Sequence, residues 1–416
     1  MQKTIQLMVA VLLFGSAIFP AHAAFTSLYI FGDGVSTTTT NKSAGQYYYG
    51  LRRSNGRVWV ELLAQQLGLT NNYWYSNNSS IHLSYTNLSA LSTNWSYSSN
   101  NWSFYGDFSP LLVTNVSHFT APPDAATALF VVWVNDADFV NDMGTIYPST
   151  NIVTWTNAIN QSLTNHWKII TNLYYAKGAR TLVMPNAVDI TEVPEYNQNP
   201  AAIKSFIRQR VIGFNTAFTA LLNQARTSLP GITIYEPDFF SLLDNVLTNA
   251  AAYGLTNALS GGQSIDVLES SLTDLSLNGP GTNYIFWDET DPTAKFHAVM
   301  ADITQQLLSP AQITNLTVLN GSVRLDVVNM PVGLNGFVDG CTNLSSWIWT
   351  TNASFSSTNT TQSIFVLACG MSQNALNFSP KDGPPPIGTV GGGTNTFLGD
   401  PLQLYRLRFP YSWTWP

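Results

Sequence analysis

The chain has 416 residues, of which 45% are hydrophobic and 12% aromatic, and this is enough apolar material to build a large core. Only 10% of the residues are charged, Lys and Arg together number 17, and the formal net charge is −7. So few basic residues, scattered along the chain, cannot form the Lys- and Arg-rich face that nucleic-acid phosphates require. We therefore expect no nucleic-acid partner, and the length predicts one large domain with a smaller one.

The first 23 residues have the composition of a secretory signal peptide. Lys3 gives the N-terminal region a positive charge, residues 5–19 are apolar, and residues 21–23 read Ala-His-Ala, which is typical of a cleavage site. We expect the mature protein to begin near Ala24 and to be secreted, into a periplasm or the extracellular space. A retained N-terminal anchor is the alternative. No later segment has the roughly 20 consecutive apolar residues of a membrane-spanning helix, so no transmembrane span is predicted.

Four β-rich apolar runs alternate with segments of helical periodicity along most of the chain. The predicted strands are residues 28–31, 128–134, 180–184 and 232–235. The predicted helices are residues 58–67, 157–175, 203–222 and 294–308. This alternation predicts a parallel sheet with helices on both faces, that is, a three-layer α/β/α sandwich of the flavodoxin-like type.

After Pro310 the pattern changes to short strands separated by turn signals. The predicted strands are residues 313–319, 323–328, 353–357, 363–368 and 402–409. The turn signals are Asn320-Gly321, Asn335-Gly336 and a Pro/Gly-rich stretch over residues 381–393. We predict a small β-sandwich over residues 310–416, which follows the main domain over residues 24–309 and the signal peptide over residues 1–23. An aromatic-rich module of this kind can bind glycans, or its tryptophans can fill its own core.

The two cysteines, Cys341 and Cys369, both lie in the predicted β-sandwich. In an oxidising compartment they can form one disulfide, which we favour over two free thiols. Two cysteines alone cannot build a metal site, and no cofactor is predicted.

Three segments lie where the carboxyl ends of the parallel strands are expected to meet, and reactive groups gather at that edge of an open sheet. They are Gly32-Asp33-Gly34-Val35-Ser36, Trp133-Val134-Asn135-Asp136 and Phe286-Trp287-Asp288-Glu289-Thr290-Asp291-Pro292-Thr293. In this order and at these separations they resemble the motif blocks of the GDSL lipase/esterase family, also called the SGNH hydrolases. Residues 47–69, 253–257 and 286–288 add to the resemblance, which covers roughly residues 27–308.

The resemblance implies an SGNH hydrolase fold and hydrolysis of lipid or carbohydrate esters by serine, histidine and aspartate. In this sequence the position of the nucleophilic serine holds Gly34, and the position of the basic histidine holds Asp291. Asp288 matches the orienting aspartate, and Asn135 matches the asparagine that binds the oxyanion. Because loss of a nucleophile costs on the order of a million-fold in kcat, we expect a degenerate hydrolase, a pseudoenzyme that binds an ester ligand and cleaves it weakly or not at all.

Three further residues are candidates for substrate binding. Asp33 precedes Gly34 in the first block, Trp133 takes the place of the glycine of the second block, and Gly106 is a loosely aligned candidate for a second glycine donor to the oxyanion. Asp136 and Asp138 are expected to cap or solvate the loop after the second strand.

Two routes to an active enzyme remain open. In the first, the hydroxyl of Ser36 or Thr37 reaches the vacant position in a reshaped turn. In the second, Asp33, Asp288 and Asp291 activate water or gather a hard metal ion. If Asp288 and Asp291 lie side by side, like-charge repulsion should raise the pKa of one of them.

The histidines offer no obvious replacement for the missing base. His297 lies more than one helical turn beyond Asp291 and is in the wrong register. His82, His118 and His166 are expected in a polar loop, a linker and a helix, without a partner that spacing alone reveals.

Overall fold

The structure is a computed structural model that describes residues 25–38, 47–49, 52–69, 100–319, 322–341, 350–367 and 404–409. The predicted signal peptide, most of the aromatic stretch before Ser103, and Cys369 lie outside the described residues, so the signal peptide and the disulfide stay predictions. Within the described part of the chain, no helix is both long and apolar enough to cross a membrane.

A four-stranded parallel sheet forms the centre of the main domain. Its strands are β1 (Leu28–Gly32), β2 (Leu129–Trp133), β3 (Thr181–Val183) and β4 (Thr233–Tyr235), and they lie side by side in chain order. Every residue of β1 and β2 is buried. Parallel strands buried on both faces require a helical layer on each side.

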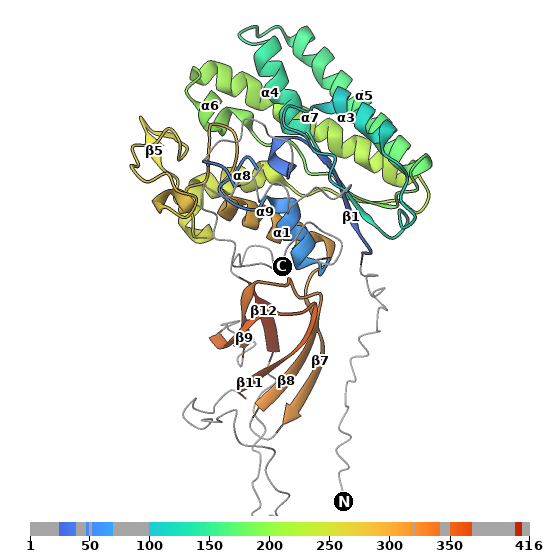
Figure 1. Cartoon of the computed structure of the whole chain (residues 1–416), viewed down its shortest axis with the longest axis vertical. Coiled ribbons are helices and arrows are strands. Elements are labelled where there is room, and N and C mark those ends of the chain that lie inside the picture. Colours follow the sequence, from blue (N-terminus) through green and yellow to red (C-terminus); the bar gives the residue numbers. More distant parts are fainter. Residues whose placement is uncertain are drawn as a thin grey trace, which may run out of the picture.

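Helices cover both faces of this sheet, as Figure 1 shows. One layer contains α3 (Ser109–His118), α4 (Asn135–Thr145), α5 (Ile152–Tyr175) and α7 (Ala201–Ser228). The other contains α1 (Trp59–Gln66), α8 (Phe239–Asn249) and α9 (Ala294–Leu308), and a four-residue helix, α6 (Pro194–Asn197), lies in a connection. The predicted three-layer α/β/α sandwich is confirmed.

The sequence missed four helices of the described part of the chain and shortened two others. Residues of α3, α4, α6 and α8 were not predicted to be helical, α5 begins earlier than expected, and α7 ends later. Side-chain caps explain two of these differences. Asn151 Oδ1 accepts hydrogen bonds from the N–H groups of Val153 and Thr154 at the start of α5, and Asp238 accepts from Ser241 at the start of α8.

Two three-stranded antiparallel sheets follow the main domain. One has the order β10 (Thr350–Ser356), β9 (Asn335–Cys341), β12 (Leu404–Arg408), and the other has the order β11 (Thr361–Leu367), β8 (Ser322–Val328), β7 (Gln312–Leu319). Leu325 of β8, Val338 of β9 and Leu407 of β12 belong to one buried cluster, so the two sheets share a core. The predicted C-terminal β-sandwich is confirmed.

The turn predicted at Asn335-Gly336 is wrong, because these residues begin β9, the central strand of its sheet. Gly336 pairs with Phe355 of β10, and a Cβ atom at Gly336 would collide with the Phe355 ring. Glycine is therefore needed here to admit a neighbouring side chain, and not to form a turn.

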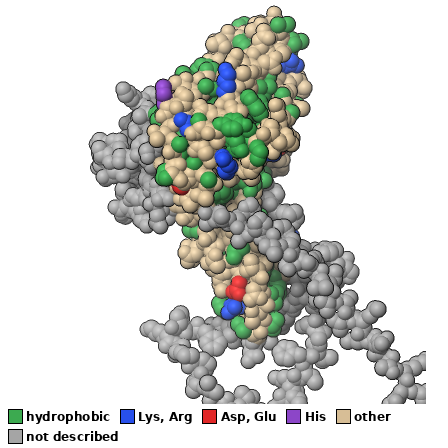
Figure 2. All heavy atoms as spheres, turned by 90° about the vertical axis from the view of Figure 1, so that its right-hand side faces the viewer, with side chains coloured by type: hydrophobic (Ala, Val, Ile, Leu, Met, Phe, Trp, Pro, Cys, Tyr) green, Lys and Arg blue, Asp and Glu red, His purple; other side chains and the backbone are tan. Residues whose placement is uncertain are grey.

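The β-sandwich contacts the ends of α1 and α9. Val332 N–H donates to Gln66 O over 3.3 Å, and Gln305 Nε2 donates to Asn329 O over 3.2 Å. α9 ends at Leu308 and β7 begins at Gln312, while the division at residues 309 and 310 stays a prediction. On the face shown in Figure 2, charged side chains of the described residues are sparse, as the composition predicts.

Candidate functional site

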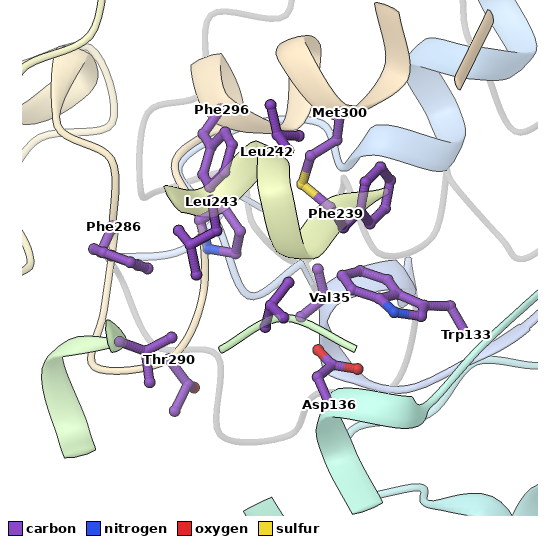
Figure 3. A pocket seen from close by; sticks show the side chains of 13 residues that line it. Val35, Trp133, Asp136, Phe239, Leu242, Leu243, Phe286, Thr290, Phe296 and Met300 are labelled. Carbon is purple, nitrogen blue, oxygen red and sulfur yellow. The ribbon is translucent and has the colours of Figure 1, made fainter. Parts of the chain in front are cut away.

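A cavity of about 300 Å³ opens at the carboxyl ends of β1 and β2. The turn after β1, the start of α4, the loop around Tyr105 and the segment before α9 all line it. A smaller apolar cavity of about 40 Å³ lies beside it, and side chains of α8 and α9 line that inner cavity (Figure 3). The two cavities share Val35, Asp136, Val188, Val193 and Thr290, so they form one pocket with an inner and an outer part.

Gly34 and Asp291 face each other across the outer cavity. Asp33 begins a short 3-10 helix, Gly34–Ser36, by accepting a hydrogen bond from Val35 N–H. A Cβ atom built on Gly34 would lie 3.7 Å from Asp291 Oδ1, as expected if these positions correspond to the nucleophile and base of a hydrolase. The same Cβ would lie only 2.9 Å from Cδ2 of Tyr105. The tyrosine ring therefore occupies the space that a nucleophilic side chain needs.

Asp288 is held by four hydrogen-bonding groups. Its Oδ1 accepts from the N–H groups of Thr290, over 3.1 Å, and Asp291, over 2.8 Å. Its Oδ2 accepts from the hydroxyl of Tyr48 over 2.7 Å and lies 3.0 Å from Nη2 of Arg53. Both carboxylate oxygens of Asp288 therefore already accept hydrogen bonds from the protein, and no lone pair is left for a histidine or a water molecule.

Arg53 joins the two carboxylates. Its Nη2 pairs with Asp288, and its Nε lies 3.3 Å from Asp291 Oδ2. The guanidinium also lies over two aromatic rings, 5.0 Å from the centre of Tyr48 and 4.4 Å from the centre of Tyr105. Because the Arg53 side chain is only 10% exposed, these ion pairs are weakly screened by solvent.

The segment that carries Arg53 is fixed to the segment that carries Asp291. Arg52 forms a buried two-bond ion pair with Glu61, at 2.5 and 3.1 Å. Ser54 Oγ donates to Pro292 O over 2.9 Å, and the Asn55 side chain accepts from the N–H of Ala294 over 2.8 Å. These bonds place Arg53 opposite both carboxylates.

Burial raises the pKa of three carboxyl groups in the cavity. The pKa of Asp33 is well above its usual value through burial, then through the charges of Asp136 and Asp291. Burial raises the pKa of Asp136 to about 7. The pKa of Asp291 is also raised, by burial first and by the charge of Asp288 second, while Arg53 opposes the shift. The expected shift within the carboxylate pair is confirmed at Asp291, with burial as its main cause.

We expect Asp136→Asn to be more stable than the parent chain, and by more at pH 8 than at pH 5. A carboxyl group whose pKa is raised in the folded chain takes up a proton on folding, so its penalty grows as the pH rises toward that pKa. From a folded pKa of about 7, the advantage of Asn over Asp grows by roughly 2 to 3 kcal/mol between these pH values. Urea unfolding at both pH values measures it, and an advantage that is constant or larger at pH 5 would contradict this assignment.

The structure does not bring Ser36 into the cavity. Its Oγ accepts a hydrogen bond from Trp59 Nε1 over 3.0 Å, and its side chain is fully buried. His297 is also fully buried, accepts at Nδ1 from the N–H of Trp59, and has a pKa that burial lowers to about 3. Thr37 donates to Ser103 O over 2.8 Å and is buried as well. The hydroxyl rescue therefore has no geometric support.

Ser36→Ala is expected to lower the free energy of unfolding by about 1 to 3 kcal/mol, because the buried indole N–H of Trp59 loses its acceptor. Ligand binding in the cavity should not change, since Ser36 does not line it. Urea unfolding and a binding titration on the same sample measure the two effects. A variant with full stability and impaired binding would place Ser36 in the site.

The remaining candidates are distributed around the pocket. Asn135 is fully buried, donates from Nδ2 to Pro185 O over 2.8 Å, and lines neither part of the pocket. Trp133 donates to Asn186 O and its ring lines the inner cavity. Gly106 lines the outer cavity with a φ of +86°, a conformation that favours glycine.

Asp136 and Asp138 were expected to cap or solvate a loop. They lie instead in the buried first turn of α4. Asp138 accepts hydrogen bonds from Ser162 Oγ and from the N–H of Ser109, and Ser162 Oγ lies 3.4 Å from Nδ1 of His166. His166 thus has the serine and carboxylate neighbours that spacing did not reveal. The cluster is buried away from both parts of the pocket, so we interpret it as structural. His118, expected in a linker, is the last residue of α3.

Sequence reasoning missed Arg53, Tyr48 and Tyr105 as parts of the site. Tyr48 and Arg53 fall within residues 47–69, which resemble the family's stretch after its first block, but that resemblance gave them no role in the site. Tyr105 lies far along the chain from that stretch. In the described ranges, no group of three or more His, Cys, Asp or Glu side chains is arranged to hold a metal ion, so the metal alternative has no site there.

Comparison with known proteins identifies the family of the chain. The family description of the GDSL-like lipase/acylhydrolases matches residues 28–304. A GDSL esterase/lipase of Arabidopsis thaliana is 23% identical over 320 residues, which cover 69% of this chain and 82% of that protein. A second one from the same plant is 23% identical over 318 residues, covering 66% and 85%. A crystal structure described as a GDSL-like lipase from Parabacteroides merdae aligns with 68% of this chain and 96% of its own, at 10% identity and a TM-score of 0.37. Since the family match spans most of the chain and includes the blocks that carry Gly34, Asn135, Asp288 and Asp291, the chain belongs to the GDSL-like lipase/acylhydrolase family.

Proposed function

We propose that this chain is a secreted GDSL-family protein that binds a small ester-bearing ligand and has lost serine-type hydrolysis. The observation that carries the proposal is the surroundings of Gly34. The nucleophile position has no side chain, the ring of Tyr105 lies over it, and the base position holds an aspartate that is paired with Arg53. Each of these features alone removes a requirement of serine-type ester hydrolysis.

The charge of the cavity also opposes ester hydrolysis. Attack on an ester carbonyl places negative charge on its oxygen, and hydrolases stabilise that charge with hydrogen-bond donors. Here the carboxyl groups of Asp33, Asp136 and Asp291 line the cavity where such an oxygen would lie, and the amide of Asn135 donates to Pro185. An oxyanion formed beside the ionised forms of these groups is destabilised rather than stabilised.

The shape of the pocket favours a ligand with an apolar part. The inner cavity is lined by aromatic and aliphatic side chains, among them Trp133, Phe239 and Met300 (Figure 3). Its small volume suits a short acyl or alkyl group better than a sugar ring. This supports the lipid-type ester over the carbohydrate ester, both of which the family resemblance implies.

One active alternative has a specific observation in its favour. Asp291 Oδ1 faces the space beside Gly34, and its raised pKa would let it take a proton from water near neutral pH. Its pairing with Arg53 and Thr290 opposes this role, because both groups stabilise the carboxylate that would have to accept the proton. Hydrolysis that is present in the parent chain and lost in Asp291→Asn would favour this alternative.

The test of the proposed function uses p-nitrophenyl acetate, p-nitrophenyl butyrate and acetylated sugars as substrates, with the same esters titrated as ligands. We expect measurable binding of the short apolar esters and no product above that formed without protein. Turnover that survives removal of trace contaminants would reject the loss of hydrolysis.

Export is tested separately by expressing residues 1–416 in a bacterium and sequencing the N-terminus of the recovered protein. We expect a new N-terminus near Ala24 in the periplasm or the medium. An intact N-terminus in the membrane fraction would favour the retained anchor.

A further inference from the structure

The outer cavity carries an excess of acidic side chains. Its lining includes Asp33, Asp107, Asp136, Glu195, Glu289 and Asp291 and contains neither Lys nor Arg. Arg53 pairs with Asp291 through Nε and with Asp288 through Nη2, so its charge is shared between the two carboxylates. Among the residues that the structure describes, no basic group forms an ion pair with Asp33 or Asp136.

Asp136 has an unmet requirement for a hydrogen-bond donor. Its side chain is 6% exposed, and its Oδ1 has no hydrogen-bond partner within the described part of the chain. Figure 3 shows the carboxylate at the edge of the pocket, directed toward Val35 and the cavity. Buried polar atoms are almost always paired, so an unpaired carboxylate oxygen that faces a cavity indicates a donor supplied from outside the chain.

Asp136 also lies at the junction of the two parts of the pocket. It lines the apolar inner cavity as well as the acidic outer cavity, and Val35, Val188 and Val193 share this boundary. A ligand that fills both parts therefore meets aliphatic side chains on one side of Asp136 and carboxyl groups on the other.

We infer that the pocket takes a ligand in which an ammonium group is joined to a short apolar body, with the ammonium between Asp33, Asp136 and Asp291 and the apolar body in the inner cavity. This inference rests on the proposed function, since it concerns the same pocket and names the chemical class of its ligand. An ammonium group, unlike an ester oxygen, gains from the carboxylates that surround it, and a charge-assisted contact is stronger than a neutral one. No bond is formed or broken.

Binding of an alkylammonium ion, which like a lysine ammonium stays charged over the whole neutral pH range, should release protons from the cavity. Burial raises the pKa of Asp136 to about 7, so part of this carboxyl group holds a proton in the empty pocket near neutral pH, and burial raises the pKa of Asp33 as well. A cation favours the ionised form, so its affinity should rise from pH 5.5 to pH 8. The groups that face the ammonium and contribute to this dependence are Asp33, Tyr105, Asp107, Asp136, Glu195, Glu289, Asp291 and, behind Asp291, Arg53.

The experiment titrates the chain with three ligands that share one hexyl group: hexylammonium, hexyl acetate and hexyl sulfate. Isothermal titration calorimetry at pH 8 is expected to rank the affinities ammonium first, ester second and sulfate last. Asp136→Asn should weaken the ammonium about tenfold, which corresponds to 1.4 kcal/mol, and should weaken the ester by much less. Asp302→Asn is the matched control, because it removes a buried carboxyl group that does not line the pocket.

The outcomes separate this inference from the proposed function. If hexyl acetate binds and the ammonium shows no advantage, or if Asp136→Asn weakens both equally, the inference is overturned and the ester-binding function stands. If the sulfate binds most tightly, the charge assignment of the cavity is wrong. If none of the three ligands binds, both the inference and the proposed function fail.

Discussion

Replacing Arg53 by methionine is expected to lower the free energy of unfolding by about 3 to 5 kcal/mol at pH 8. Arg53 is the cation that pairs with Asp288 and Asp291, and both carboxyl groups are nearly fully buried. Without the guanidinium, two like charges lie next to each other with little solvent between them. Methionine keeps most of the volume between the rings of Tyr48 and Tyr105, so the loss reports mainly on charge.

The pH dependence of this loss identifies its cause. Because burial and the charge of Asp288 raise the pKa of Asp291, a lower pH favours its protonated form and weakens the repulsion, so the difference between Arg53→Met and the parent chain should be smaller at pH 5 than at pH 8. The double variant Arg53→Met/Asp291→Asn should recover a large part of the stability at pH 8, because it removes one of the two charges. Urea unfolding of the four chains of this cycle gives the coupling energy. Coupling near zero, or a loss that is unchanged at pH 5, would show that Arg53 acts through packing alone.

Ester hydrolysis should not return when only the two substituted motif positions are restored. In Gly34→Ser/Asp291→His, the new Cβ at position 34 would lie 2.9 Å from the ring of Tyr105. The new imidazole would also compete with Arg53 and Tyr48 for Asp288, whose oxygens are already engaged. We expect its rate with p-nitrophenyl butyrate to equal that of the parent chain.

Adding Tyr105→Ala and Arg53→Ala to this variant should raise the rate at least about a hundredfold, the size of effect that a positioned general base supplies. The first of these opens the space over position 34, and the second frees Asp288 to accept from the imidazole. The same four substitutions with Asp288→Asn serve as the matched control and should lose most of the gain. Equal activity of the two-position and four-position variants would show that Tyr105 and Arg53 do not obstruct the site.

The sequence predicted the strands of the main domain well, because each is a short apolar run that is buried on both faces. It predicted the start of α4 poorly. Asn135 and Asp136 are of residue types that favour loops, but in the folded chain they form the buried first turn of α4. Likewise, β9 was missed because Gly336 follows an asparagine, a pair that is typical of a turn. In the structure Gly336 lies in a strand, and its missing side chain leaves room for the ring of Phe355.

The candidate site was predicted in part for a related reason. The motif blocks identified Gly34, Asp288 and Asp291, which the fold brings together at the carboxyl ends of the strands. The pairing of Arg53 with Asp288 and Asp291 spans more than half of the chain and leaves no local pattern. The inward position of Ser36 depends on Trp59, whose indole N–H needs a buried acceptor. Such contacts are decided by tertiary packing and not by spacing.

Loss of serine-type hydrolysis is the central claim, and it is tested most directly by treating the chain with a serine-directed phosphonate ester and then measuring p-nitrophenyl butyrate hydrolysis. We predict no covalent adduct by mass spectrometry, no burst of p-nitrophenol and no turnover above the rate in buffer. An adduct at Ser36, together with turnover that disappears in Ser36→Ala, would contradict the account.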